Sequence, residues 1–171
     1  MNNLTLKRSG KSAVLTARLA LVCCLALSTS TWADSGCGIV RGDAELTSAP
    51  AGPFQGPAWI SIGETVFYPQ ILVLGTGAKV TEDGTVVGTT RITFDFGGGG
   101  VFVLGNDHFA LDPTDNPGEF RLADHGRITE GTGLFADAFG KVMLQGTVSL
   151  SATGEGSANL TIKGKVCDVA A

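Results

Sequence analysis

The chain has 171 residues, enough for one domain, with 12 lysines and arginines against 16 aspartates and glutamates. The four charges before residue 34 are all basic, so the rest of the chain keeps 8 cations (12 minus 4) against 16 acids, a net charge of −8. This acidity argues against nucleic acid and anionic lipid surfaces as partners, although ordinary solubility is the simpler explanation for it.

The first 33 residues have the pattern of a secretory signal peptide. Basic residues precede the apolar run LALVCCLAL, and the small residues Thr31 and Ala33 stand before the predicted cleavage site. The run is too short to span a bilayer, which needs about 20 residues, so we expect no membrane insertion of the mature chain. We predict cleavage after Ala33, export to a periplasm or out of the cell, and a single domain over residues 34–171.

Cys37 and Cys167 lie near the two ends of this predicted domain. Export leads to an oxidising compartment, where such a pair can form a disulfide. The bond requires the first and last strands to meet in space, as they do in a closed barrel. We predict this disulfide; the alternative is a pair of buried thiols.

Short runs of valine, isoleucine, threonine and phenylalanine between glycine-rich turns predict many short strands and no long helix. In chain order, the predicted strands lie within CGIVRGDAEL (37–46), PAWISIGETVFYPQILVLG (57–75, two strands), TVVGTTRITFDF (85–96), VFVLGNDHFAL (101–111), EFRLADHGRIT (119–129), KVMLQGTVSLS (141–151) and ANLTIKGKVC (158–167). Pro69 predicts a bend or a sheet edge, because proline cannot donate a ladder hydrogen bond.

The last two predicted strands alternate most clearly between apolar and polar residues. Val142, Leu144 and Val148 share one face of the first of them, and the small-residue link SATGEGSA predicts a hairpin between the two. About eight such strands with few helices predict an all-β fold, an eight-stranded antiparallel β-barrel. A β-sandwich is the alternative.

Glycines punctuate the segment RITEGTGLFADAFGKVMLQGTV, residues 127–148. A phosphate-binding loop would need Ser or Thr after Gly140-Lys141 and a helix behind it, and this segment has neither. We expect Gly131 and Gly133 to adopt positive φ angles, Phe135 to plug one end of the barrel and Gly140 to release the chain into the next strand. The motif is therefore interpreted as structural.

The same segment resembles the pattern I-x-G-G-T-G-x-F-x-G-A-x-G-x-V of the allene oxide cyclase barrel family and the related dirigent proteins. The matching residues are Gly131, Thr132, Gly133, Phe135, Ala138 and Gly140. The resemblance covers about 40 residues up to Cys167, and Asp137 stands where glycine is common. It implies an eight-stranded antiparallel barrel, in agreement with the strand count, and assembly into homo-oligomers.

Enzymes of the family that this chain resembles need no cofactor and use an acidic side chain inside the barrel. By rough position Glu64 is the nearest candidate for that catalytic acid, although a solvent-facing turn after Gly63 is the favoured interpretation of it. Tyr68, Arg91 and Asp95 are weak candidates for ligand contacts. Arg91 and Asp95 share a face opposite the neighbouring phenylalanines, and we favour phenylalanines inside and charges outside.

The dipeptide Asp-His occurs at residues 107–108 and 124–125, but no ligand spacing supports a metal site, and we predict neither a metal nor a cofactor.

Three functions remain open. The first is a non-catalytic barrel that binds a small apolar ligand or acts through its surface, the second a cofactor-free isomerase or cyclase, and the third a structural or interaction protein with a filled barrel. Lumen size separates them: if Phe94, Phe96, Phe102 and Phe109 all point inward, we expect no room for a ligand.

Overall fold

The computed structural model describes residues 36–170 of the chain, and the predicted signal peptide lies outside this range. The strands are β1 (Cys37–Ser48), β2 (Phe54–Ile62), β3 (Thr65–Phe67), β4 (Gln70–Val80), β5 (Val86–Asp95), β6 (Val101–Pro113), β7 (Glu119–Gly131), β8 (Phe139–Leu150) and β9 (Gly156–Cys167). Two short 3₁₀ turns, η1 (Gly97–Gly99) and η2 (Gly133–Phe135), follow β5 and β7. The described residues include no helix long and apolar enough to cross a membrane.

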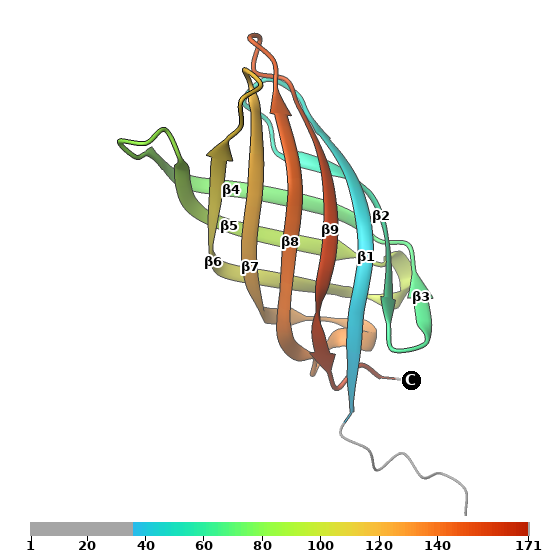
Figure 1. Cartoon of the computed structure of the whole chain (residues 1–171). Helices are drawn as coiled ribbons and strands as arrows, with labels where there is room; N and C mark the ends of the chain where they lie inside the picture. The colour runs from blue at the N-terminus through green and yellow to red at the C-terminus, as the bar shows by residue number, and fades with distance from the viewer. Residues whose placement is uncertain (1–35, 171) are drawn as a thin grey trace, which may run out of the picture. The chain divides into compact units, whose positions relative to one another are not determined.

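Eight of the nine strands close into an antiparallel barrel. The sheet runs in the order β1-β9-β8-β7-β6-β5-β4-β2, and β1 also pairs with β2, which closes the ring. Figure 1 shows β7, β8, β9 and β1 side by side, with β4, β5 and β6 crossing behind them. The predicted eight-stranded barrel is confirmed. Because the ring is closed, it leaves no exposed edge between its first and last strands.

β3 and β4 share one edge of β2 and are separated by a break at Tyr68 and Pro69. Ile60 of β2 pairs with Phe67 of β3, whereas Pro57 pairs with Gln70 of β4. The carbonyl of Pro69 still accepts a hydrogen bond of 3.0 Å from the Ala58 amide. The bend predicted at Pro69 is confirmed. It separates β3 from β4, because proline has no amide hydrogen to donate to the sheet.

Alternation of side chains along each strand builds the interior. On β8, Val142, Leu144 and Val148 are buried, and β9 returns against β8 as the predicted hairpin with Leu160 and Ile162 buried. Fully burying an aliphatic side chain of this size contributes about 1.5–3 kcal/mol. The polar residues between them face outward, as the period of two requires.

Five phenylalanine rings fill one end of the lumen, which we call the aromatic end. They are Phe67, Phe94, Phe96, Phe102 and Phe135, with neighbouring ring centroids 4.3 to 5.9 Å apart. Edge and offset contacts of this kind add about 0.5–1.5 kcal/mol per pair to the gain from burial. Phe135 comes from η2 and is fully buried, so it does plug this end of the barrel as expected.

The glycines of the motif before Phe135 have two different roles. Gly133 has the expected positive φ of 60°. Gly131 does not have a positive φ, and that expectation was wrong. A Cβ atom at Gly131 would lie 1.7 Å from the carbonyl oxygen of Phe135, so the constraint there is close packing of two backbone segments.

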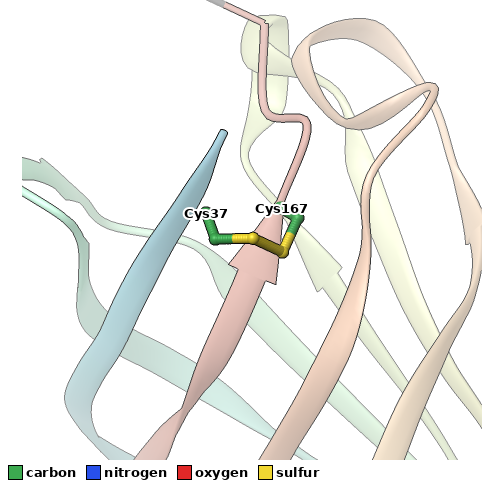
Figure 2. Close-up of a disulfide and its surroundings, with 2 residues drawn as sticks. All are labelled: Cys37 and Cys167. Carbon is green, nitrogen blue, oxygen red and sulfur yellow. A yellow bond between two sulfur atoms is a disulfide. The ribbon is translucent and has the colours of Figure 1, made fainter. Parts of the chain in front are cut away.

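The predicted disulfide joins the first and last strands of the chain, β1 and β9. Cys37 of β1 lies directly opposite Cys167 of β9, and the two are bonded (Figure 2). The bond lies at the aromatic end of the barrel, beside Phe139 at the start of β8. A disulfide in this position is consistent with an oxidising compartment.

Candidate functional site

The lumen at the end opposite the aromatic end, which we call the pocket end, contains a cavity of about 400 Å³. All eight strands of the ring contribute to its wall, and the loop between β1 and β2 borders it. The lining residues are Leu46, Ala51, Gly52, Pro53, Phe54, Val73, Leu74, Gly75, Thr90, Ile92, Phe109, Leu111, Leu122, Asp124, Leu144, Val148, Ala158 and Leu160. The wall is therefore almost entirely apolar.

Asp124 and Thr90 form the polar spot of this cavity. Asp124 is 1% exposed and Thr90 is 7% exposed, and they are the buried polar side chains among the residues that the structure describes. The Thr90 hydroxyl donates a hydrogen bond of 2.8 Å to Oδ2 of Asp124. Burying a carboxyl group among apolar side chains is costly unless it is hydrogen-bonded, so this arrangement needs an explanation.

Sequence reasoning missed Asp124 as a lumen residue, although the strand pattern contains the information. Leu122, Asp124, Gly126 and Ile128 occupy alternate positions of β7, and this is the face that turns inward. The β5–β6 register also shifts between Thr90 and Ile92. Such bulges re-aim side chains and occur often beside functional sites.

The four phenylalanines whose direction was expected to decide the room in the lumen all turn toward the interior but do not fill it. Phe94 and Phe102 are fully buried at the aromatic end, and Phe96 packs beside them. Phe109 instead lines the cavity. The expectation that these rings together leave no room was wrong, because three of them gather at one end and the opposite end remains open.

Glu64 and Tyr68 lie outside the lumen. Glu64 is exposed in the tight turn between β2 and β3, in agreement with the favoured interpretation of a solvent-facing turn. Tyr68 is 80% exposed beside the break at Pro69. Neither side chain borders the cavity, and any ligand contact by Tyr68 stays a prediction.

Arg91 and Asp95 point away from the lumen, while Ile92 and Phe94 between them are buried. Arg91 donates two hydrogen bonds to the Glu130 carboxylate, of 2.8 and 2.7 Å. These hydrogen bonds, together with the attraction of opposite charges, lower the pKa of Glu130 and raise the pKa of Arg91. Asp95 accepts a hydrogen bond of 2.8 Å from the Gly97 amide. Their contact with a ligand stays a prediction.

The second Asp-His dipeptide is divided between the two sides of the barrel wall. His125 is exposed and lies directly opposite His108 on β6, whereas the neighbouring Asp124 points into the lumen. In the part of the chain that the structure describes, no three histidine, cysteine or acidic side chains gather as a metal site would require. The pairing of the two strands thus brings the histidines together, while the Asp124 carboxylate lies on the other side of the wall.

Compared with known proteins, the chain matches no family profile, no curated protein and no solved structure. The eight-stranded antiparallel barrel is observed directly. The family resemblance carried by the glycine motif therefore remains a hypothesis.

Proposed function

We propose that this protein is an exported barrel, periplasmic or secreted, that binds a small apolar ligand in its lumen without transforming it. The observation that supports this function is the cavity of about 400 Å³ at the pocket end. Ligand sites of proteins are mostly apolar, have about 300–1,000 Å³ of volume and contain a few polar groups that orient the ligand. The cavity has this size and this chemistry.

The expected ligand is largely hydrocarbon and carries one polar group. Among the described residues that line the cavity, Thr90 and Asp124 supply the polar side chains, so a hydroxyl, amine or amide placed there can exchange hydrogen bonds with them. Exposed residues at the rim, including Ala51, Pro53 and Leu74, mark the entrance. A ligand without the polar group would leave the Asp124 carboxyl beside hydrocarbon and is expected to bind more weakly.

A cofactor-free isomerase or cyclase is the second candidate, and one observation favours it. A carboxyl group enclosed in an apolar cavity is suited to transferring a proton to or from a bound substrate. In this function Asp124 would be the acid, in place of Glu64, and Thr90 would orient it. Replacement of Asp124 by Asn would then abolish turnover while leaving the ligand bound.

The test measures binding of a neutral apolar probe, N-phenyl-1-naphthylamine. Binding is detected by the increase in the fluorescence of the probe and by native mass spectrometry. Ala158→Leu adds volume to the cavity wall and should abolish the fluorescence increase. Ala123→Leu makes the same change on the outward face of β7 and should leave binding intact. Melting curves of both variants check that they fold. Equal binding by both variants would contradict the proposed site.

A further inference from the structure

Both histidines of the chain lie in one row on the outer face of the barrel wall. The strand register places His108 of β6 directly opposite His125 of β7. Both side chains are exposed, whereas the neighbouring Phe109 and Asp124 are buried on the lumen side. The two imidazoles therefore extend from the same outer surface on adjacent strands.

A methionine continues this row on the next strand. Met143 of β8 lies directly opposite His125, and it is the one methionine after the predicted signal peptide. Its neighbours Val142 and Leu144 are buried inside the barrel, so the half-buried Met143 side chain belongs to the outer face. The register thus brings together two imidazoles and one thioether from three different strands.

The spacing within this row suits a shared metal ion. Residues directly opposite in an antiparallel pair have Cβ atoms about 4.5–5.5 Å apart, and a bond between a metal ion and an imidazole nitrogen is about 2 Å long. An ion above His125, the middle residue, can therefore be held by ligands from both neighbouring strands. The unbranched Met143 side chain has three rotatable bonds with which to reach it.

The wall beside the histidines gives their rings room to turn. The next outward pair on these strands is Ala110 opposite Ala123, and a hollow of about 560 Å³ borders both alanines and both histidines. The β6–β7 register also shifts between Gly105 and His108. Such bulges re-aim side chains and occur often beside functional sites.

We propose that His108, His125 and Met143 bind a soft monovalent metal ion, copper(I). Thioether sulfur is a soft ligand that selects copper(I), and imidazole also suits copper. All three ligands are uncharged when they hold a metal, and the next residue of the row on β9 is Lys163, directly opposite Met143. Positive charge beside an uncharged ligand set opposes a divalent ion more than a monovalent one.

Zinc suits this row less well than copper(I). Among the described residues, no cysteine or carboxylate joins the two histidines in a group of three, and zinc sites are usually completed by such ligands. Cys37 and Cys167 are bonded to each other, so neither offers a thiolate that would draw the soft ion elsewhere. The site is on the outer side of the wall and does not depend on a ligand in the lumen.

The test is an NMR titration of the mature protein with silver nitrate in chloride-free buffer, because silver(I) replaces copper(I) as a probe that air does not oxidise. Residues 34–171 contain one methionine and two histidines, so the methionine methyl signal belongs to Met143 and the imidazole signals to the proposed ligands. We expect the three side chains to shift together and to saturate at one silver ion per barrel. Anaerobic competition with the chelator bicinchoninate then measures the Kd for copper(I).

A conservative variant tests the thioether. Met143→Leu removes the sulfur and keeps an apolar side chain of similar volume, so the barrel is expected to stay folded. The matched control is Gln145→Leu, at the next outward position of β8. Loss of a group that only supports a metal ligand typically costs about 10–100-fold in affinity, so loss of the ligand itself should raise the Kd for copper(I) by about tenfold or more. The control should leave the Kd unchanged.

The two histidine variants, His108→Gln and His125→Gln, should weaken copper(I) binding at least as much. A wild-type Kd in Met143→Leu, tighter binding of zinc than of copper(I), or a silver titration that leaves the Met143 methyl signal in place would each overturn the proposal. No binding by the wild type would do the same. The silver titration uses the unaltered protein, so its result stands even if a variant fails to fold.

Discussion

At the aromatic end five phenylalanine rings fill the lumen, whereas at the pocket end mostly aliphatic side chains surround a cavity of about 400 Å³. The aromatic end also holds the disulfide between β1 and β9. The pocket end has small residues such as Ala158 and the buried pair Thr90 and Asp124 instead. Both ends belong to one hydrogen-bonded ring.

This difference assigns stability and the proposed ligand binding to different parts of one barrel. Dense packing at the aromatic end gains burial and dispersion energy, while the pocket end gives up contacts that a filled lumen would make. The closed ladder between them holds the cavity open without needing side chains to fill it. A ligand-binding barrel is therefore expected to be most rigid at the end farthest from its ligand.

The largest expected effect comes from emptying the aromatic end. Phe102→Ala removes a fully buried ring and is expected to reduce the free energy of unfolding by about 3–5 kcal/mol. Phe54→Ala, at a partly buried ring beside the cavity, is expected to lose roughly half of that or less. Urea denaturation of both variants measures the difference. Equal losses would mean that the two ends are packed alike.

Removal of the disulfide should have the next largest effect. Cys37→Ala with Cys167→Ala releases two residues that are 130 apart in the chain. The simple loop-entropy model gives a loss of about 5 kcal/mol, and measured losses are typically about 2–4 kcal/mol. Hydrogen exchange should rise first in the strand ends beside the bond. An increase that begins at the pocket end would contradict this assignment.

A pair of matched substitutions compares the two kinds of packing with one chemical change. Ala44→Leu adds volume to a buried site that does not border the cavity and should cost about 1–3 kcal/mol. Ala158→Leu can extend into the cavity and should cost less than about 1 kcal/mol. Melting temperatures of the two variants measure the difference in the cost of the added volume. If Ala158→Leu costs as much as Ala44→Leu, the cavity does not accommodate the added side chain.

The smallest expected effect concerns the surface ion pair between Arg91 and Glu130. Its hydrogen bonds hold the pKa of Glu130 below the ordinary value of 4.5. A lowered carboxyl pKa adds stability that is fully present above pH 4.5 and is lost as the pH falls through the lowered value. Glu130→Gln should therefore lower the melting temperature slightly at neutral pH and not at all well below pH 4.5. Because both side chains are exposed, added salt should reduce the effect.

Alternation in the sequence was sufficient to predict the barrel and its hairpin of β8 and β9, and two cysteines near the ends of the domain were sufficient to predict the disulfide. Each of these depends on a local period of two or on the meeting of the first and last strands. The cavity could not be predicted in the same way. Its volume depends on where along the barrel axis the rings of Phe94, Phe102 and Phe109 come to lie, and this follows from the stagger of the strands.

Asp124 and the outward lysines of β8 and β9 differ in how visible their arrangement is in the sequence. Asp124 interrupts an otherwise apolar alternation on β7, which is a signal of an inward polar residue that was not used. Lys141, Lys163 and Lys165 alternate on two strands of a predicted hairpin, so their common face was also accessible. That Lys141 lies opposite Arg127 required the register between β7 and β8, which alternation alone does not determine.

The bond between Cys37 and Cys167 also changes what a cut in the chain would do. It joins the first and last strands near their outer ends, so residues 37–167 form one covalent loop. A protease that cleaves the exposed loop between β6 and β7, around Asp115 and Asn116, would leave a single molecule with its barrel ladder intact. New ends could be opened there by circular permutation, since the start of β1 and the end of β9 already lie side by side.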